Sequence, residues 1–128
     1  GFFEHHDRYG KKIPNYIYKK DEHPFFVAGL YNEWTNPEDS KTQHTFTIVT
    51  TQATGFMHEL HNAANEPRMP LILDEVSAKD WLKKKEINEV PEMTDFTYHE
   101  VRPIRGKLAT GNEPKSQELF QSDLDLFS

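Results

Sequence analysis

The stretch that decides the fold runs from His44 to Asp74 and reads HTFTIVTTQATGFMHELHNAANEPRMPLILD. Its first part, residues 45–51, is rich in β-branched and aromatic side chains, which predicts a strand covered on both faces. A short helix is expected next, with Thr54 as its N-cap. A polar loop then leads to a second apolar strand, which begins at residues 69–73. This order predicts that His61 is held rigidly at the rim of a sheet.

The rest of the chain alternates short strands with polar turns. Residues 25–34 predict a long apolar strand in which Gly29 marks a bulge or a close backbone approach. Ser77 is the expected N-cap of a second short helix. Residues 96–102 alternate apolar and polar side chains, which is typical of a half-buried strand. Strands with short helices at the edges predict a strongly bent sheet or barrel, and residues 121–128 are expected to be a late-packing or fraying tail.

Composition and charge limit the possible function. The chain has 128 residues, 35% hydrophobic and 28% charged, which suits one globular domain. No apolar run approaches the roughly 18 residues that a membrane-spanning helix needs. A net charge of −6 does not attract nucleic acid through the overall field. The absence of cysteine excludes disulfides, thiolate catalysis and zinc–thiolate sites formed by this chain alone.

Glu4 and His61 are the candidates for proton transfer. A carboxylate next to the apolar side chains of Phe2 and Phe3 suits a general acid or base, although a solvated position at a strand end explains the same residues. His61 carries an imidazole, which titrates near neutral pH and suits an acid–base group. The alternative for His61 is a structural role, because imidazolium is favoured at the C-terminus of a helix.

Two further groups of side chains carry weaker signals. His58 and His61 are three residues apart, whereas the metalloprotease helix places its two histidines four apart. A metal site could still draw on His5, His6 and a carboxylate, so a small metal-dependent hydrolase is one alternative. Guanidinium groups suit the binding of phosphate. The candidates for this are Arg68, Arg102 and Arg105.

Several segments follow one another in a familiar order. They are GFFE at residues 1–4, FFVAGL at 25–30 with Trp34, TFTIVTT at 45–51, LHN at 60–62 and RMPLIL at 68–73. Together they resemble the SRAP family, the SOS response-associated peptidase proteins, which shield abasic sites in DNA. The resemblance implies an α+β fold, mostly antiparallel and barrel-like, with short peripheral helices.

The resemblance also implies a reaction. In the family a cysteine becomes the first residue after the initiator Met is removed, and its thiol and amine close a thiazolidine with the aldehyde of an abasic site. The product is a reversible crosslink to single-stranded DNA. The matching acid–base residues are Glu4 and His61, which are expected to meet across one pocket. The expected substrate-binding residues are Thr50, Arg68, Asn62 and His5. Neither a metal nor a cofactor is implied.

Some features depart from the family pattern. His5 stands where an aromatic residue is common, and residues 63–67 are inserted before Arg68. Residues 1–120 are expected to be the C-terminal portion of one SRAP domain, followed by the tail at 121–128. The expected partners are abasic single-stranded DNA and the cysteine-bearing N-terminal half of the domain, with no membrane, in the bacterial cytoplasm near the nucleoid. A relative that binds DNA without catalysis is a further alternative, so enzymatic activity is open.

Overall fold

The computed structural model describes residues 1–84, 86–87, 89–107 and 109–120. The chain divides into two compact units. The first unit contains Gly1–Pro24, Ala53–Pro67 and the described part of Met93–Ser128, and the second contains Phe25–Gln52 and Arg68–Glu92. The expected tail at 121–128 lies outside the described residues. A single domain over residues 1–120 stays a prediction.

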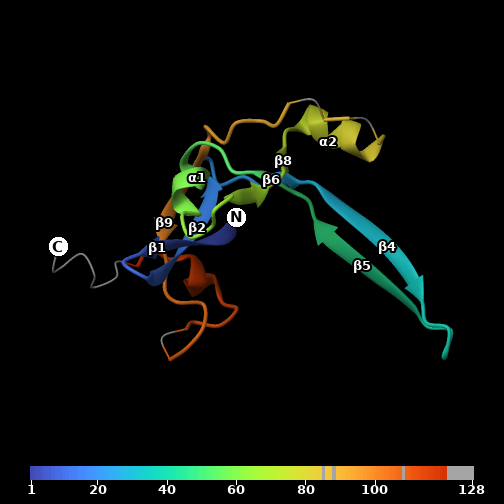
Figure 1. The fold of residues 1–128 in the computed structure, drawn as a ribbon, viewed down its shortest axis with the longest axis horizontal. Helices are drawn as coiled ribbons and strands as arrows, with labels where there is room; N and C mark the ends of the chain where they lie inside the picture. The colour runs from blue at the N-terminus through green and yellow to red at the C-terminus, as the bar shows by residue number, and fades with distance from the viewer. Residues whose placement is uncertain (85, 88, 108, 121–128) are drawn as a thin grey trace. The chain divides into compact units, whose positions relative to one another are not determined.

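A three-stranded antiparallel sheet forms the frame of the first unit (Figure 1). Its strands, in the order β1-β2-β9, are Phe2–Arg8, Lys11–Lys19 and Phe96–Glu100. Tyr9 and Gly10 join β1 to β2, with φ values of 54° and 76°. Positive φ at both central residues is the geometry of a two-residue hairpin turn whose twist matches that of the strands. The half-buried strand expected from residue 96 is β9.

Helix α1, Phe56–Leu60, lies against β1 and buries Met57 and Leu60. Its N-cap is Gly55 and not the expected Thr54. Gly55 has a φ of 53°, a conformation that glycine adopts without steric cost. The buried apolar residues of this unit are Ile13, Ile17, Ala53, Met57, Leu60, Met93, Phe96 and Val101.

The C-terminal part of the first unit adds little regular structure. A short 3-10 helix, η1, spans Pro114–Gln117. Val101 and Leu119 then form an isolated antiparallel bridge. The backbone therefore returns to the region that follows β9.

Besides the long hairpin of residues 29–48, two short strand pairs and one helix make up the described part of the second unit. They are β3 Phe26–Val27 with β8 Ile72–Leu73, β6 Thr50–Gln52 with β7 Arg68–Pro70, and α2 Glu75–Leu82. The backbones of Ala28, Val49 and Leu71 form a closed set of hydrogen bonds of 2.8–2.9 Å. Ala28, Leu71 and Leu73 are the buried cluster beside it. Ala28, Val49 and Leu71 lie where the chain passes from one strand pair to the next, and these bonds satisfy their backbone groups.

Helix α2 begins one turn earlier than its sequence suggests. Asp74 is the N-cap, and its Oδ1 accepts from the N–H of Ser77 at 2.7 Å. The expectation that Ser77 is the cap is therefore wrong. The hydrogen bond from Ser77 also lowers the pKa of the Asp74 carboxyl, because it stabilises the ionised form.

Within the described part of the chain, strands β4, Gly29–Thr35, and β5, Thr42–Ile48, pair only with each other and form a two-stranded ribbon (Figure 1). Every residue of both strands is exposed, so the expected covering of both faces is wrong. The long strand expected at 25–34 is interrupted at Ala28, where the backbone changes partner. The close backbone approach expected at Gly29 is found, because a Cβ there would lie 3.1 Å from the Thr47 carbonyl oxygen.

The α+β prediction is confirmed. All strand pairs among the described residues are antiparallel, they form open sheets, and the helices are short. Across the described part of the chain, no helix is both long enough and apolar enough to span a membrane.

Candidate active site

Glu4 and His61 lie together in the first unit, as expected. Glu4 Oε2 is 3.6 Å from His61 Nδ1, and the two side chains are 22% and 28% exposed. At 3.6 Å the two atoms lie just beyond hydrogen-bond distance, so a small shift of either side chain brings them within reach for proton transfer. The two residues are therefore placed to act as one acid–base pair, while their catalytic roles stay predictions.

The fold fixes each member of the pair from a different element. Glu4 lies in β1 opposite Asn15 of β2, and its Oε1 accepts from the His5 N–H at 2.7 Å. This contact leaves Oε2 facing the imidazole. His61 is the C-cap of α1, and its N–H donates to the Met57 carbonyl at 3.0 Å. Met57 is fully buried, so it anchors the helix end that carries the imidazole.

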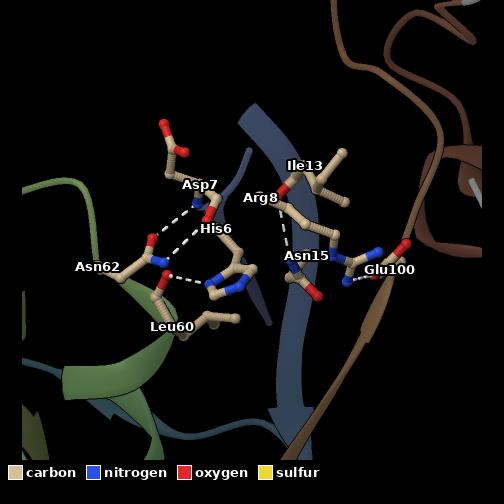
Figure 2. A network of polar contacts seen from close by, with 8 residues as sticks. All are labelled: His6, Asp7, Arg8, Ile13, Asn15, Leu60, Asn62 and Glu100. Atoms are coloured by element: carbon tan, nitrogen blue, oxygen red, sulfur yellow. Dashed lines mark hydrogen bonds and ion pairs between the residues drawn. The ribbon is translucent and has the colours of Figure 1, made fainter. Parts of the chain in front are cut away.

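Three contacts made by the side chains of Asn62 and His6 tie the end of α1 to β1 (Figure 2). The Asp7 N–H donates to Asn62 Oδ1 at 2.7 Å, and Asn62 Nδ2 donates to the Asp7 carbonyl at 2.9 Å. His6 Nδ1 lies 3.2 Å from the Leu60 carbonyl oxygen, so the tautomer with a proton on Nδ1 donates there. The amide of Asn62 thus contacts protein backbone, and its expected binding of substrate stays a prediction.

A cavity of about 390 Å³ lies along the same strand. Arg8 and Glu100 of β9 both line it, and they form an ion pair with each other (Figure 2). Asn15 is 2% exposed and donates to the Ile13 carbonyl at 3.0 Å. The remaining polar side chains of the lining are His6, Glu59, Tyr98 and His99. The cavity presents mixed donors and acceptors and no excess of positive charge.

Thr50 and Arg68 form a separate polar group in the second unit. Arg68 Nε donates to Thr50 Oγ1 at 2.9 Å, and its terminal nitrogen donates to the Thr50 carbonyl at 2.7 Å. The two residues come from the paired strands β6 and β7, and both are exposed. A guanidinium held by a neighbouring strand presents its charge in a fixed direction, which suits a phosphate.

The histidines do not form the metal site that the hydrolase alternative needs. His5 and His58 are exposed. No group of three or more His, Cys, Asp or Glu in the described ranges could hold a metal ion. Arg102, a candidate for phosphate, lies over the ring of Phe120 at 4.7 Å.

Sequence reasoning missed the contacts of His6 and Asp7 with the end of α1, and the ion pair of Arg8 with Glu100. A signal for part of this was present in the sequence. Side chains at positions 4, 6 and 8 of a strand share a face, so Glu4, His6 and Arg8 belong together. The partners of His6 and Arg8 lie 54 and 92 residues away, and no local pattern identifies them.

A family model and the related proteins that match this chain agree on one family. Residues 1–107 match the family described as SOS response associated peptidase (SRAP). The chain is 39% identical over 74 residues to abasic site processing protein YoqW of Bacillus subtilis, which covers 58% of this chain and 30% of that protein. It is 29% identical over 117 residues to abasic site processing protein YedK of Escherichia coli, which covers 84% of this chain and 50% of that protein.

A solved structure shares the fold. A crystal structure of a protein from Bacteroides thetaiotaomicron has a TM-score of 0.78 and 25% identity, over 94% of this chain and 54% of the other. The chain thus spans between about a third and a half of the length of the proteins that it resembles.

Proposed function

Because this chain belongs to the SOS response associated peptidase (SRAP) family, we propose that it is part of a protein that processes abasic sites in DNA. Relatives from Bacillus subtilis and Escherichia coli carry that description in their names. The observation that carries the proposal is the approach of Glu4 Oε2 to His61 Nδ1 at 3.6 Å. These are the two positions that match the acid–base residues of the family.

The proposed reaction joins a cysteine at a protein N-terminus to the ring-opened aldehyde of an abasic site. The α-amine adds to the aldehyde carbon and gives a carbinolamine. The Glu4 carboxyl donates a proton to the hydroxyl, which leaves as water, and an iminium forms. The sulfur then attacks the iminium carbon, and the nitrogen keeps one hydrogen in the thiazolidine. In sum, aldehyde, amine and thiol become thiazolidine and water.

His61 completes the proton balance. Its imidazole accepts the proton released when the amine or the thiol attacks, and it passes a proton to Glu4 once a small side-chain shift closes the 3.6 Å separation to hydrogen-bond distance. In the reverse direction the same pair delivers water to the iminium, which hydrolyses the crosslink. The peptidase in the family name corresponds at most to removal of a leader residue from the same protein.

The cysteine comes from outside these 128 residues, because the chain contains none. The partner that we propose is the N-terminal half of the same domain, which also supplies most of the positive charge. DNA carries a dense negative charge, and a chain with a net charge of −6 needs that contribution. Thr50, Arg68 and His5 are the proposed contacts of this chain to single-stranded DNA, in the cytoplasm near the nucleoid, whereas the amide of Asn62 bonds to the backbone of Asp7.

The proposal is tested with the protein as its gene encodes it. Incubation with single-stranded DNA that carries an abasic site is expected to give a band shift that survives a denaturing gel. A tetrahydrofuran analogue has no aldehyde and is expected to give no shift. The residues encoded upstream of Gly1 are expected to include a cysteine directly after the start Met.

The alternative without catalysis makes the opposite prediction. The lack of cysteine in this chain favours it in one respect. In that case the native protein would retard abasic DNA on a native gel and form no adduct under denaturing conditions. A gene with no cysteine after its start Met would also favour this alternative.

A further inference from the structure

Strand β1 lies at the edge of the β1-β2-β9 sheet, and side chains bond to three backbone groups at its outer edge, the N–H of His5 and the N–H and carbonyl of Asp7. The His5 N–H donates to Glu4 Oε1 at 2.7 Å. At Asp7 both backbone groups bond to the amide of Asn62, at 2.7 and 2.9 Å (Figure 2). Alternate residues of a strand direct their backbone groups to the same edge. The outer edge of β1 therefore holds the side chains of both Glu4 and Asn62, and Asn62 is the residue that follows His61.

We propose that Asn62 is a positioning residue, whose amide clamps β1 to the end of α1 and so holds His61 Nδ1 against Glu4 Oε2. The inference rests on the function proposed above for that pair. A primary amide suits the task because it offers a donor and an acceptor together, as a neighbouring strand would. A carboxylate offers acceptors alone, and an aliphatic side chain of the same shape offers neither.

The local structure makes such a clamp necessary. Helix α1 has five residues, a length at which helices are not stable by themselves. His61 lies beyond its last residue, where the chain turns into an irregular loop up to Pro67. Among the described residues, the burial of Met57 and Leu60 and the side chains of His6 and Asn62 hold this end to β1, together with the contact of His61 with Glu4. Asn62 is adjacent to the imidazole in sequence, so it controls the imidazole most directly.

The first part of the test uses NMR to measure how Asn62 positions β1 and His61, and it does not require the protein to be active. In ¹⁵N-labelled native protein, Asn62→Leu is expected to speed hydrogen exchange of the Asp7 amide. Glu4→Gln is expected to shift the ring nitrogen resonances of His61 in the parent and to leave them unchanged in the Asn62→Leu background. Asn65→Leu is the matched control, because Asn65 is an exposed asparagine of the same loop.

The second part of the test measures the rate of adduct formation and its dependence on DNA concentration. Asn62→Leu is expected to lower the first-order rate of adduct formation at saturating abasic DNA by about 10- to 100-fold, the scale of a misplacement of about 1 Å. The DNA concentration that gives half of the maximal rate is expected to stay the same. A residue that only binds DNA would change that concentration instead.

A conservative variant supplies a rescue. In Asn62→Asp the ionised carboxyl accepts from the Asp7 N–H and cannot donate to the Asp7 carbonyl. When pH is lowered and the introduced carboxyl is protonated, both bonds become possible again. The rate of Asn62→Asp relative to the parent is therefore expected to rise as pH falls. Each rate is divided by the parent rate at the same pH, because the ionisable side chains of Glu4, His6, Asp7 and His61 are present in both proteins.

The outcomes separate the clamp from the proposed function. If the parent forms no adduct but the His61 resonances respond as described, the clamp stands and the function fails. If the parent forms the adduct and Asn62→Leu matches it in rate, the clamp is overturned. A His61 ring that still responds to Glu4→Gln in the Asn62→Leu background also overturns it.

Discussion

Ile17 in the β1-β2-β9 sheet has no exposed surface, whereas Ile48 in the β4–β5 ribbon is 53% exposed. Both strands alternate and contain β-branched or aromatic residues, so their sequences predict the same local structure. Helix α1 packs against β1 of the sheet, while the ribbon has exposed residues on both faces. Strand formation thus follows from local sequence, and burial follows from which elements are present to cover the strand.

The largest expected difference between the two regions comes from truncating these isoleucines. Ile17→Ala is expected to lower the free energy of unfolding by about 2–5 kcal/mol, because it leaves a cavity in a packed core. Ile48→Ala is expected to change it by about 0.5 kcal/mol or less, as at most surface positions. Urea unfolding of the two variants measures this. Equal losses would mean that the ribbon is covered in the native protein by a segment outside this chain.

A smaller difference is expected between the paired glutamate side chains of the two regions, Glu100 beside Arg8 and Glu33 beside His44. The side chains of Arg8 and Glu100 are 24% and 17% exposed, and those of His44 and Glu33 in the ribbon are 71% and 62% exposed. Glu100→Gln is expected to lower the free energy of unfolding by about 1–2 kcal/mol, since a charged hydrogen bond out of water is lost.

The matched control is Glu33→Gln in the ribbon. It is expected to change the free energy of unfolding by about 0.5 kcal/mol or less, because exposed pairs contribute little. Denaturant midpoints at neutral pH measure both variants. A loss at Glu33 as large as that at Glu100 would remove the distinction between the two regions.

The smallest expected effect concerns the helix N-termini. Asp74 caps α2 through its side chain, whereas Gly55 at α1 has none. The Ser77 N–H lowers the pKa of Asp74, so the cap stabilises the fold above the unfolded-state pKa of about 3.9 and loses this effect as pH falls through the folded pKa.

Asp74→Asn keeps a capping side chain but does not titrate. The thermal midpoint of the parent relative to Asp74→Asn is therefore expected to fall as pH is lowered from about 5 towards 2. Thermal scans across this range measure the difference. A constant difference would show that the Asp74 carboxylate does not contribute through its charge.

Part of the fold was predictable because it depends on local patterns. The alternation at residues 96–102 predicts β9, and the apolar spacing after Thr54 predicts α1. The caps were not predictable in the same way, because Gly55 functions through a positive φ that no side chain reveals. The exposure of β5 was not predictable either, since it depends on partners that the sequence of the strand does not specify.

The candidate site, too, could be predicted from local sequence only in part. The pairing of Glu4 with His61 came from the family resemblance, and the residues alone allowed a solvated or a structural role. The clamp of Asn62 on Asp7 joins residues 55 apart in sequence. In the sequence, Asn62 reads as a turn residue and Asp7 as a residue at a strand end. Only the folded chain shows that they meet.

The central claim is that Glu4 and His61 act as one acid–base pair on an abasic site. The most direct test is the rate of adduct formation by the native protein with Glu4→Gln, His61→Gln and both changes. Each single change is expected to slow the reaction by about 100-fold or more, the usual contribution of general acid–base catalysis, and the double variant is expected to be no slower than the slower single one. Multiplication of the two losses, or no loss in either single variant, would contradict the claim.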